Sequence, residues 1–270
     1  MASTLKFAGL FLITAVSAAV VNSGGIPNAS KWVPGSTLEP GHLIVPLDGV
    51  VEHAVKESDY LNWLKSKGVL LKAPELDPSW VTYNASDIPA VETREVVTER
   101  DLEARAPCSQ TYSITTDNTI TFVDWDLQMS TVACAHFGDL TVTVTSGHSI
   151  ANTIGGSAGV DLGFVKDRLT GSLGINYSRT WTTTQSTSDA HVVHDGFCGV
   201  MIYKPITTRR YGRQFVGCVG NIKQVGTWYA DSHKSASYNG LSWVEGAVSY
   251  CEKRQANPPL SRCEGGGNFI

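Results

Sequence analysis

Apolar and polar residues alternate along residues 141–188, a stretch without cysteine or proline. Successive side chains of a strand point to opposite faces, so this period of two predicts one apolar and one polar face. The alternation is interrupted at Lys166-Asp167-Arg168 and then resumes. The pattern predicts a long amphipathic β-hairpin that turns at these three residues. Its apolar face would carry Ile154, Val160, Leu162, Phe164, Leu173, Ile175, Tyr177 and Trp181.

Residues 106–270 have the composition of β-structure throughout. Residues 112–123 are rich in threonine and isoleucine, and residues 140–145 alternate strictly. Shorter apolar runs follow at 192–203, 214–219, 228–229 and 242–250. Because β-branched and aromatic residues dominate and no helical period stands out, we expect an all-β domain. It would be a sandwich or an elongated antiparallel sheet that contains the 141–188 hairpin.

Residues 19–105 differ from the rest of the chain. They have a net charge of −5, whereas residues 106–270 are neutral, and they hold seven of the eleven prolines and no cysteine. We expect this part to be mostly irregular, with one short helix. Ser58 would be its N-cap, Gly68 would follow its end, and its apolar side would be formed by Tyr60, Leu61, Trp63 and Leu64.

Residues 1–18 have the features of a secretory signal peptide, with Lys6 before an apolar run and small residues up to Ala18. The sequence Leu102-Glu103-Ala104-Arg105 resembles the kexin-type maturation sites of fungal secreted proteins. Cleavage after Arg105 would remove residues 19–105 as an acidic pro-segment; the alternative is a loosely folded N-terminal domain with a charged linker. A second candidate site is the pair of basic residues Lys253-Arg254.

Six cysteines lie after residue 107, which in a secreted protein implies up to three disulfides. No CxxC pair occurs, so no zinc site is expected. The pairing stays open among Cys108, Cys134, Cys198, Cys218, Cys251 and Cys263. Three glycosylation sequons begin at Asn28, Asn84 and Asn176.

The serine- and threonine-rich hairpin, with alternating arms and a short polar tip, resembles the insertion stem of aerolysin-like pore-forming toxins. In that family the stem unfolds from the soluble form after proteolytic activation, and several copies assemble in the membrane. The resemblance implies a membrane-lipid partner and a homo-oligomer. Each predicted arm has the roughly ten residues that a membrane-crossing strand needs. Asp161 would then have to face water, and a glycan on Asn176 would block insertion. The alternative is a hairpin packed by one face on a β-sandwich core.

Few residues point to catalysis, and no GxSxG, HExxH or phosphate-binding glycine loop occurs. A ribonuclease-type hydrolase would use His136 as base and a basic cluster for the phosphate. That cluster would be Arg209, Arg210 and Arg213, which also fit a solvated turn.

Two further groups of side chains have the composition of binding sites. On a strand, His191 and His194 would point to opposite faces, so we expect solvent-facing histidines and no metal site. Trp228, Tyr229 and Trp243 would form the sugar-stacking surface of a polysaccharide-binding module.

The layout resembles that of small cysteine-containing secreted proteins of filamentous fungi. The leading hypothesis is a secreted, non-enzymatic effector or toxin-like protein that acts on a host or competitor cell through residues 141–188. A secreted ribonuclease and a cell-wall-binding module are the alternatives. No cofactor is expected, and the neutral charge of residues 106–270 disfavours a nucleic-acid partner.

Overall fold

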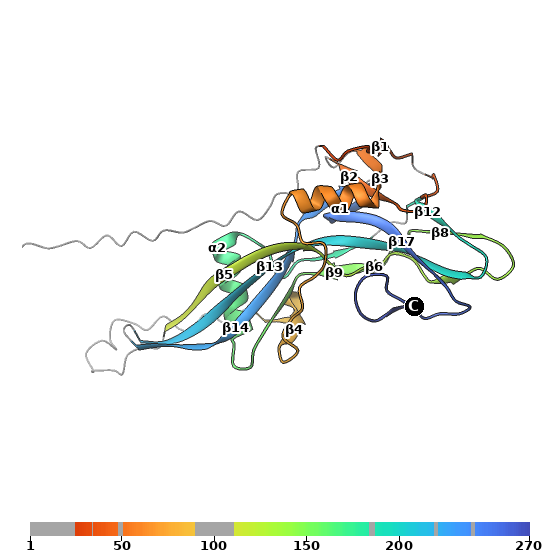
Figure 1. Cartoon of the computed structure of the whole chain (residues 1–270). Coiled ribbons are helices and arrows are strands. Elements are labelled where there is room, and N and C mark those ends of the chain that lie inside the picture. Colours follow the sequence, from red (N-terminus) through yellow and green to blue (C-terminus); the bar gives the residue numbers. More distant parts are fainter. Residues whose placement is uncertain are drawn as a thin grey trace, which may run out of the picture.

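The computed structural model describes residues 25–33, 35–47, 51–89, 111–183, 187–218, 221–238 and 241–270. Antiparallel β-structure dominates these residues, which confirms the all-β prediction. Figure 1 shows an elongated molecule in which β5 (Thr111–Val123), β13 (Phe197–Cys218) and β14 (Asn221–His233) extend side by side along one half. The other half carries β17 (Gly246–Arg254) and the first N-terminal elements, which lie within residues 30–66.

Strand β13 is the central strand of the largest sheet and pairs with five other strands. Its second half pairs with β5 and β14, and its first half pairs with β17 and the short strands β6 (Leu127–Gln128) and β7 (Ala133–Cys134). The prediction of a solvated turn at Arg209, Arg210 and Arg213 is therefore wrong, because these residues lie within a continuous strand of 22 residues. Acidic and hydroxyl partners from other strands make the basic run compatible with the sheet.

The predicted 141–188 hairpin is present only at its base. Strand β9 (Ser149–Ala151) pairs with β11 (Thr180–Thr182); next to this ladder, β8 (Leu140–Thr143) pairs with β12 (Ala190–Val193), which begins beyond the predicted end at Ser188. Beyond this base the prediction is wrong: β10 (Thr153–Gly156) joins the large sheet, and helix α2 (Leu162–Leu173) replaces the tip.

Local signals explain helix α2. The Asp161 side chain accepts a hydrogen bond from the Phe164 amide (3.0 Å), which caps the first turn. Gly174 ends the helix in the left-handed conformation (φ 65°), which glycine adopts at little cost. Val165 and Leu169, one helical turn apart, are buried on the inner side.

The N-terminal part is more regular than predicted. It contributes β1 (Ser30–Lys31), β2 (His42–Leu47), β3 (Val51–Lys56), helix α1 (Glu57–Ser66), β4 (Val81–Asn84) and the short helix η1 (Ala85–Asp87). The predicted helix is confirmed with its buried Tyr60, Trp63 and Leu64, and Gly68 follows it at a φ of 78°. Its N-cap is Lys56 rather than Ser58. Strand β2 pairs with β17, and β4 pairs with β10, so this part completes the large sheet.

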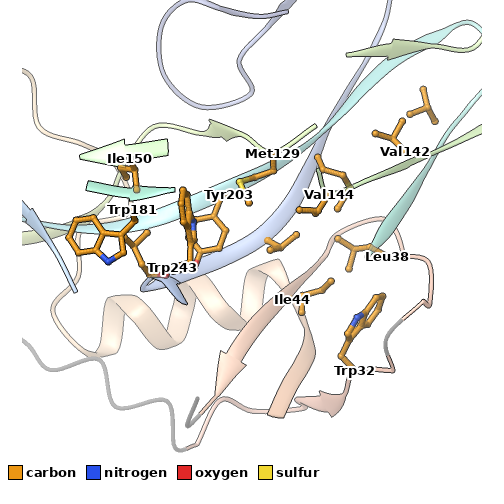
Figure 2. Packing of buried hydrophobic residues seen from close by; sticks show 14 of the residues in the cluster. Trp32, Leu38, Ile44, Met129, Val142, Val144, Ile150, Trp181, Tyr203 and Trp243 are labelled. Carbon is orange, nitrogen blue, oxygen red and sulfur yellow. Dashed lines mark hydrogen bonds between the residues drawn. The ribbon is translucent and has the colours of Figure 1, made fainter. Parts of the chain in front are cut away.

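Several hydrophobic clusters join the smaller elements to the large sheet. In the cluster drawn in Figure 2, Trp181 and Ile150 from the base of the predicted hairpin pack near Trp243 and Tyr203. A second cluster joins α1 to the sheet through Val123, Ile206 and Ala247.

The remaining strands are β15 (Ser235–Tyr238), β16 (Leu241–Val244), β18 (Leu260–Ser261) and β19 (Asn268–Phe269).

Disulfides stabilise the β-structure, as predicted. Cys134 is bonded to Cys198, and Cys251 to Cys263. Cys218 is also disulfide-bonded, and Cys108 lies outside the described residues.

Candidate functional site

The β9–β11 ladder at the base of the predicted hairpin defines a register. In the β9–β11 ladder, Trp181 lies opposite Ile150 and Thr180 opposite Ala151. The register continues for one more residue, because the Asn152 amide donates to the Arg179 carbonyl (3.3 Å). After Asn152 the two arms separate. We refer to residues 153–178, which lie between them, as the convertible segment.

Continuing this register would pair the two halves of the convertible segment. Ile154 would lie opposite Tyr177, Ala158 opposite Leu173, and Leu162 opposite Leu169. Residues directly opposite each other share one face of an antiparallel pair. All the predicted apolar residues between 154 and 177 would therefore fall on one face, and the turn would lie at residues 165–166.

Hydrogen bonds on both edges of β10 now prevent that pairing. Its four residues pair with Trp228–Asp231 of β14 on one side and with Val81–Asn84 of β4 on the other. A methyl group added to Gly155 would lie 2.4 Å from the Val81 carbonyl oxygen, and one added to Gly156 would lie 2.5 Å from the Thr227 carbonyl oxygen. These glycines permit the close approach of the three strands.

Helix α2 is anchored by a buried lysine. The Lys166 side chain is 5% exposed, and its ammonium group donates to the carbonyl oxygens of Ala85 (3.4 Å) and Ile88. The methyl group of Ala85 packs with Val165 and Leu169 in a third hydrophobic cluster. An N-terminal residue and helix α2 therefore share one small core.

The membrane-hairpin candidates have different environments in this structure. Ile154, Tyr177 and Trp181 are buried, whereas Leu173 is 45% exposed. Val160, Leu162, Phe164 and Ile175 are partly buried. Leu173 is not part of the hydrophobic cluster that holds α2.

Besides its bond to Arg179, Asn152 forms hydrogen bonds to three distant parts of the chain. Its carbonyl accepts from the Ala85 amide (2.9 Å), its side-chain amide donates to the Asn176 carbonyl (3.0 Å), and its side-chain oxygen accepts from the His233 amide (2.9 Å). The residue is 1% exposed. Sequence reasoning missed Asn152 and Ala85, because all of these partners are distant in the chain and no local pattern marks them.

His233 continues this network toward a carboxylate. Its Nδ1 lies 3.2 Å from the Asn152 side-chain oxygen, an acceptor, so Nδ1 carries a proton. Its Nε2 lies 3.0 Å from the Thr207 hydroxyl, which is also 2.9 Å from Asp124 Oδ2. In neutral His233 the unprotonated Nε2 is an acceptor, as is Asp124 Oδ2. The Thr207 hydroxyl has one proton, so it can donate to only one of these two groups. Burial lowers the pKa of His233 to about 4.

A buried ion pair lies beside this network. Arg209 donates from Nε and Nη2 to the two oxygens of Asp231, both at 2.7 Å, and from Nη1 to the Pro74 carbonyl (3.0 Å). Burial raises the pKa of Asp231 to about 6, although Arg209 opposes the shift. A cavity of about 820 Å³ lies next to the pair, between residues 73–82 and the sheet. Three nitrogens of the Arg209 guanidinium thus donate to groups within the fold, and the residue is 5% exposed. We therefore assign Arg209 a structural role.

The structure does not bring the other proposed ribonuclease residues together. Arg210 donates to the Tyr177 and Ser232 hydroxyls, and Arg213 forms an exposed ion pair with Asp117 (2.8 Å). His136 follows β7, which pairs with Cys198 eleven residues before Arg209 on the same strand. Eleven residues of strand span about 36 Å, so His136 and Arg209 are too far apart to act on one bond.

The histidine pair matches its prediction only in part, because His194 is exposed and His191 is not. His191 is 2% exposed and stacks on Tyr250 with ring centroids 3.4 Å apart, so it does not face solvent. Both histidines contact one carboxylate: His191 Nε2 lies 3.4 Å from Glu252, and His194 Nδ1 lies 3.0 Å from it. His194 lies beyond the end of β12, where the strict alternation no longer applies. Among the described residues, no cluster of three or more His, Cys, Asp or Glu has the arrangement of a metal site.

The proposed sugar-stacking surface is absent from the described part of the chain. Trp228, Tyr229 and Trp243 are at most 2% exposed, so they cannot stack on a polysaccharide. Tyr229 is covered by Trp80 (5.8 Å between ring centroids), and Trp243 packs in the cluster of Figure 2.

The predicted modification sites are placed only in part. Asn28, Asn84 and Asn176 are exposed. Lys253 and Arg254 end β17, and the Lys253 ammonium donates to Ser261 and Arg262. Ala18 and Arg105 lie outside the described residues.

None of the helices described here is long and apolar enough to span a membrane. No family model, curated protein or solved structure matches this chain.

Proposed function

We propose that this protein is a secreted, non-enzymatic, toxin-like effector that acts on the membrane of a host or competitor cell. The convertible segment would leave the sheet, extend the β9–β11 ladder and enter the lipid as a hairpin. The observation that supports the proposal is the register of that ladder, which would place the apolar residues of both arms on one face. The mapped disulfides fit a protein that folds in an oxidising, secretory compartment.

The length and polarity of the segment suit this role. Each arm, residues 153–164 and 167–178, exceeds the roughly 9–11 residues of a tilted membrane-crossing strand. The turn at residues 165–166 would carry Lys166, a charge suited to the far side of the bilayer. Asp161 would lie opposite Thr170 on the polar face, away from lipid.

The helical form of the segment is only moderately stable by itself. An isolated helix shorter than about 12–15 residues is marginal in water, and α2 has 12 residues including two internal glycines. Its position depends on packing against Ala85, Ile154 and Trp228. Loss of that packing would leave little to oppose the hairpin.

Two matched substitutions test the membrane role. Leu173→Asp would place a charge near mid-depth on the apolar face of the hairpin, whereas Ser172→Asp would place it on the polar face. Both residues are exposed in the present fold, so both variants should fold. A carboxylate in the bilayer interior costs on the order of 2–3 kcal/mol, so Leu173→Asp should reduce dye release from vesicles by about 30-fold or more.

Dye release is measured on phosphatidylcholine–phosphatidylserine vesicles after cleavage of the protein at Arg105. Ser172→Asp should release dye at nearly the rate of the unmodified protein. Equal rates for the two variants, or no release at any pH by the parent protein free of a glycan on Asn176, would show that the segment does not enter the membrane as a hairpin.

A further inference from the structure

We propose that residues 70–88, which we call the strap, form an intramolecular clamp that keeps the convertible segment in its folded position. Release of the strap would be the event that permits conversion. What the released segment then does rests on the proposed function, but the clamp itself does not.

The strap crosses one sheet face from one outer strand to the other. Leu70 is hydrogen-bonded to the edge of β5, through the Thr121 carbonyl and the Val123 amide, both at 2.9 Å. Further along, the Pro74 carbonyl accepts from Arg209 of β13, and Trp80 stacks on Tyr229 of β14. Strand β4 then pairs with the outer edge of β10. The strap therefore contacts β5, β13, β14 and β10 in their spatial order.

The end of the strap holds both halves of the convertible segment. Strand β4 occupies the edge of β10 that conversion would have to free. Immediately after it, Ala85 donates its amide to Asn152, the last residue of the existing ladder, and accepts from Lys166 of α2. The Ile88 carbonyl is the second acceptor for Lys166. Residues 81–88 therefore hold both Asn152, where the pairing of the two arms stops, and helix α2, which replaces the tip of the predicted hairpin.

The strap has no covalent tie to the sheet other than the chain itself. No cysteine precedes Cys108, so no disulfide can retain residues 70–88. A cut at Arg105 would give the strap a free end on the side next to α2. Residues 81–88 could then separate from β10 while α1 stays docked in its own cluster with Val123, Ile206 and Ala247.

A cysteine pair reports the conversion directly. Val160→Cys and Gly171→Cys would be opposite each other in the hairpin, about 5 Å apart. In the present fold Val160 lies before the start of α2, and Gly171 lies in its last turn, nine residue steps or about 13 Å along the helix axis from Leu162. A short thiol cross-linker should therefore join them only after conversion. Val160→Cys with Ser172→Cys, which would point to opposite faces, controls for the register.

The cross-linking rate is measured with vesicles on the full chain and on the chain cut at Arg105. The cut should raise the rate about tenfold or more. In the uncut chain Lys166→Met should also raise it, because both carbonyl hydrogen bonds of the buried ammonium are lost. Arg168→Met removes the same charge from the exposed side of α2 and should leave the rate unchanged.

The outcomes separate the two proposals. Equal rates before and after cutting, or equal rates for Lys166→Met and Arg168→Met, would overturn the clamp. Faster cross-linking without dye release would support the clamp and contradict the membrane function. Full dye release by the uncut chain would support the membrane function and overturn the clamp.

Discussion

The two ends of helix α2 offer a graded test of conversion. Asp161→Ala removes the side-chain acceptor for the Phe164 amide, and Gly174→Ala forces a residue with a Cβ into the left-handed conformation at a φ of 65°. Loss of an N-cap costs about 1 kcal/mol, and alanine in the left-handed region costs about the same. Within the part of the chain that the structure describes, neither residue forms a hydrogen bond with the strap. Both substitutions therefore weaken the helix without altering the clamp.

The expected magnitude follows from these two contributions. The sites are 13 residues apart with no shared partner, so their effects should add to about 2 kcal/mol. That sum corresponds to about a 30-fold shift toward the hairpin. The matched controls are Asp161→Asn and Gly174→Asn, because asparagine serves as an N-cap and tolerates the left-handed conformation.

The assay is the cross-linking rate of the Val160→Cys, Gly171→Cys reporter on the protein cut at Arg105. Each alanine variant should raise the rate about fivefold and the double variant about 30-fold. The two asparagine variants should stay within about twofold of the parent. If alanine and asparagine variants behave alike, the segment does not need to unwind α2, and the reasoning fails.

Three further predictions concern stability, measured by urea unfolding. Arg209→Met should cost about 3–5 kcal/mol because it leaves Asp231 buried and unpaired, whereas Arg213→Met, at an exposed pair, should barely change the midpoint; similar losses would contradict the structural role of Arg209. The pKa of His233 is lowered to about 4, so its contribution to stability is complete above pH 6.5 and is lost as the pH falls toward 4. His233→Gln should accordingly gain about 2 kcal/mol relative to the parent between pH 7.5 and 4.5, and no gain would refute the lowered pKa. Gly155→Ala should destabilise by about 1–3 kcal/mol through its clash with the Val81 carbonyl, while Gly171→Ala, in open space on α2, should stabilise by up to about 1 kcal/mol.

The sequence predicts local β-structure well where burial is one-sided. The strictly alternating residues 140–145 contain β8, in which Val142 is buried between the exposed Thr141 and Thr143, and the threonine- and isoleucine-rich residues 112–123 lie in β5. Prediction from the sequence fails at Arg209. Its charge is compatible with a buried strand only because Asp231, on a different strand, forms an ion pair with it. Such a partner is set by the fold and leaves no mark near residue 209.

The convertible segment was mispredicted for a different reason. Its residues satisfy two periods: Leu162, Val165 and Leu169 recur at helical spacing, while residues 154–164 alternate. Asp161 and Gly174 are recognisable helix start and stop signals. Local pattern alone cannot choose between the two forms, since the choice depends on Ala85 and β14, which are far away in the chain.

A sequence that serves two structures is constrained twice, and this leaves a trace in evolution. Leu173 is 45% exposed in the fold and is not part of the hydrophobic cluster that holds α2. If the hairpin is used, natural variation should keep an aliphatic side chain at that position while neighbouring exposed positions drift. Selection on a side chain outside the core of the resting molecule would reveal the second structure without any assay of its activity.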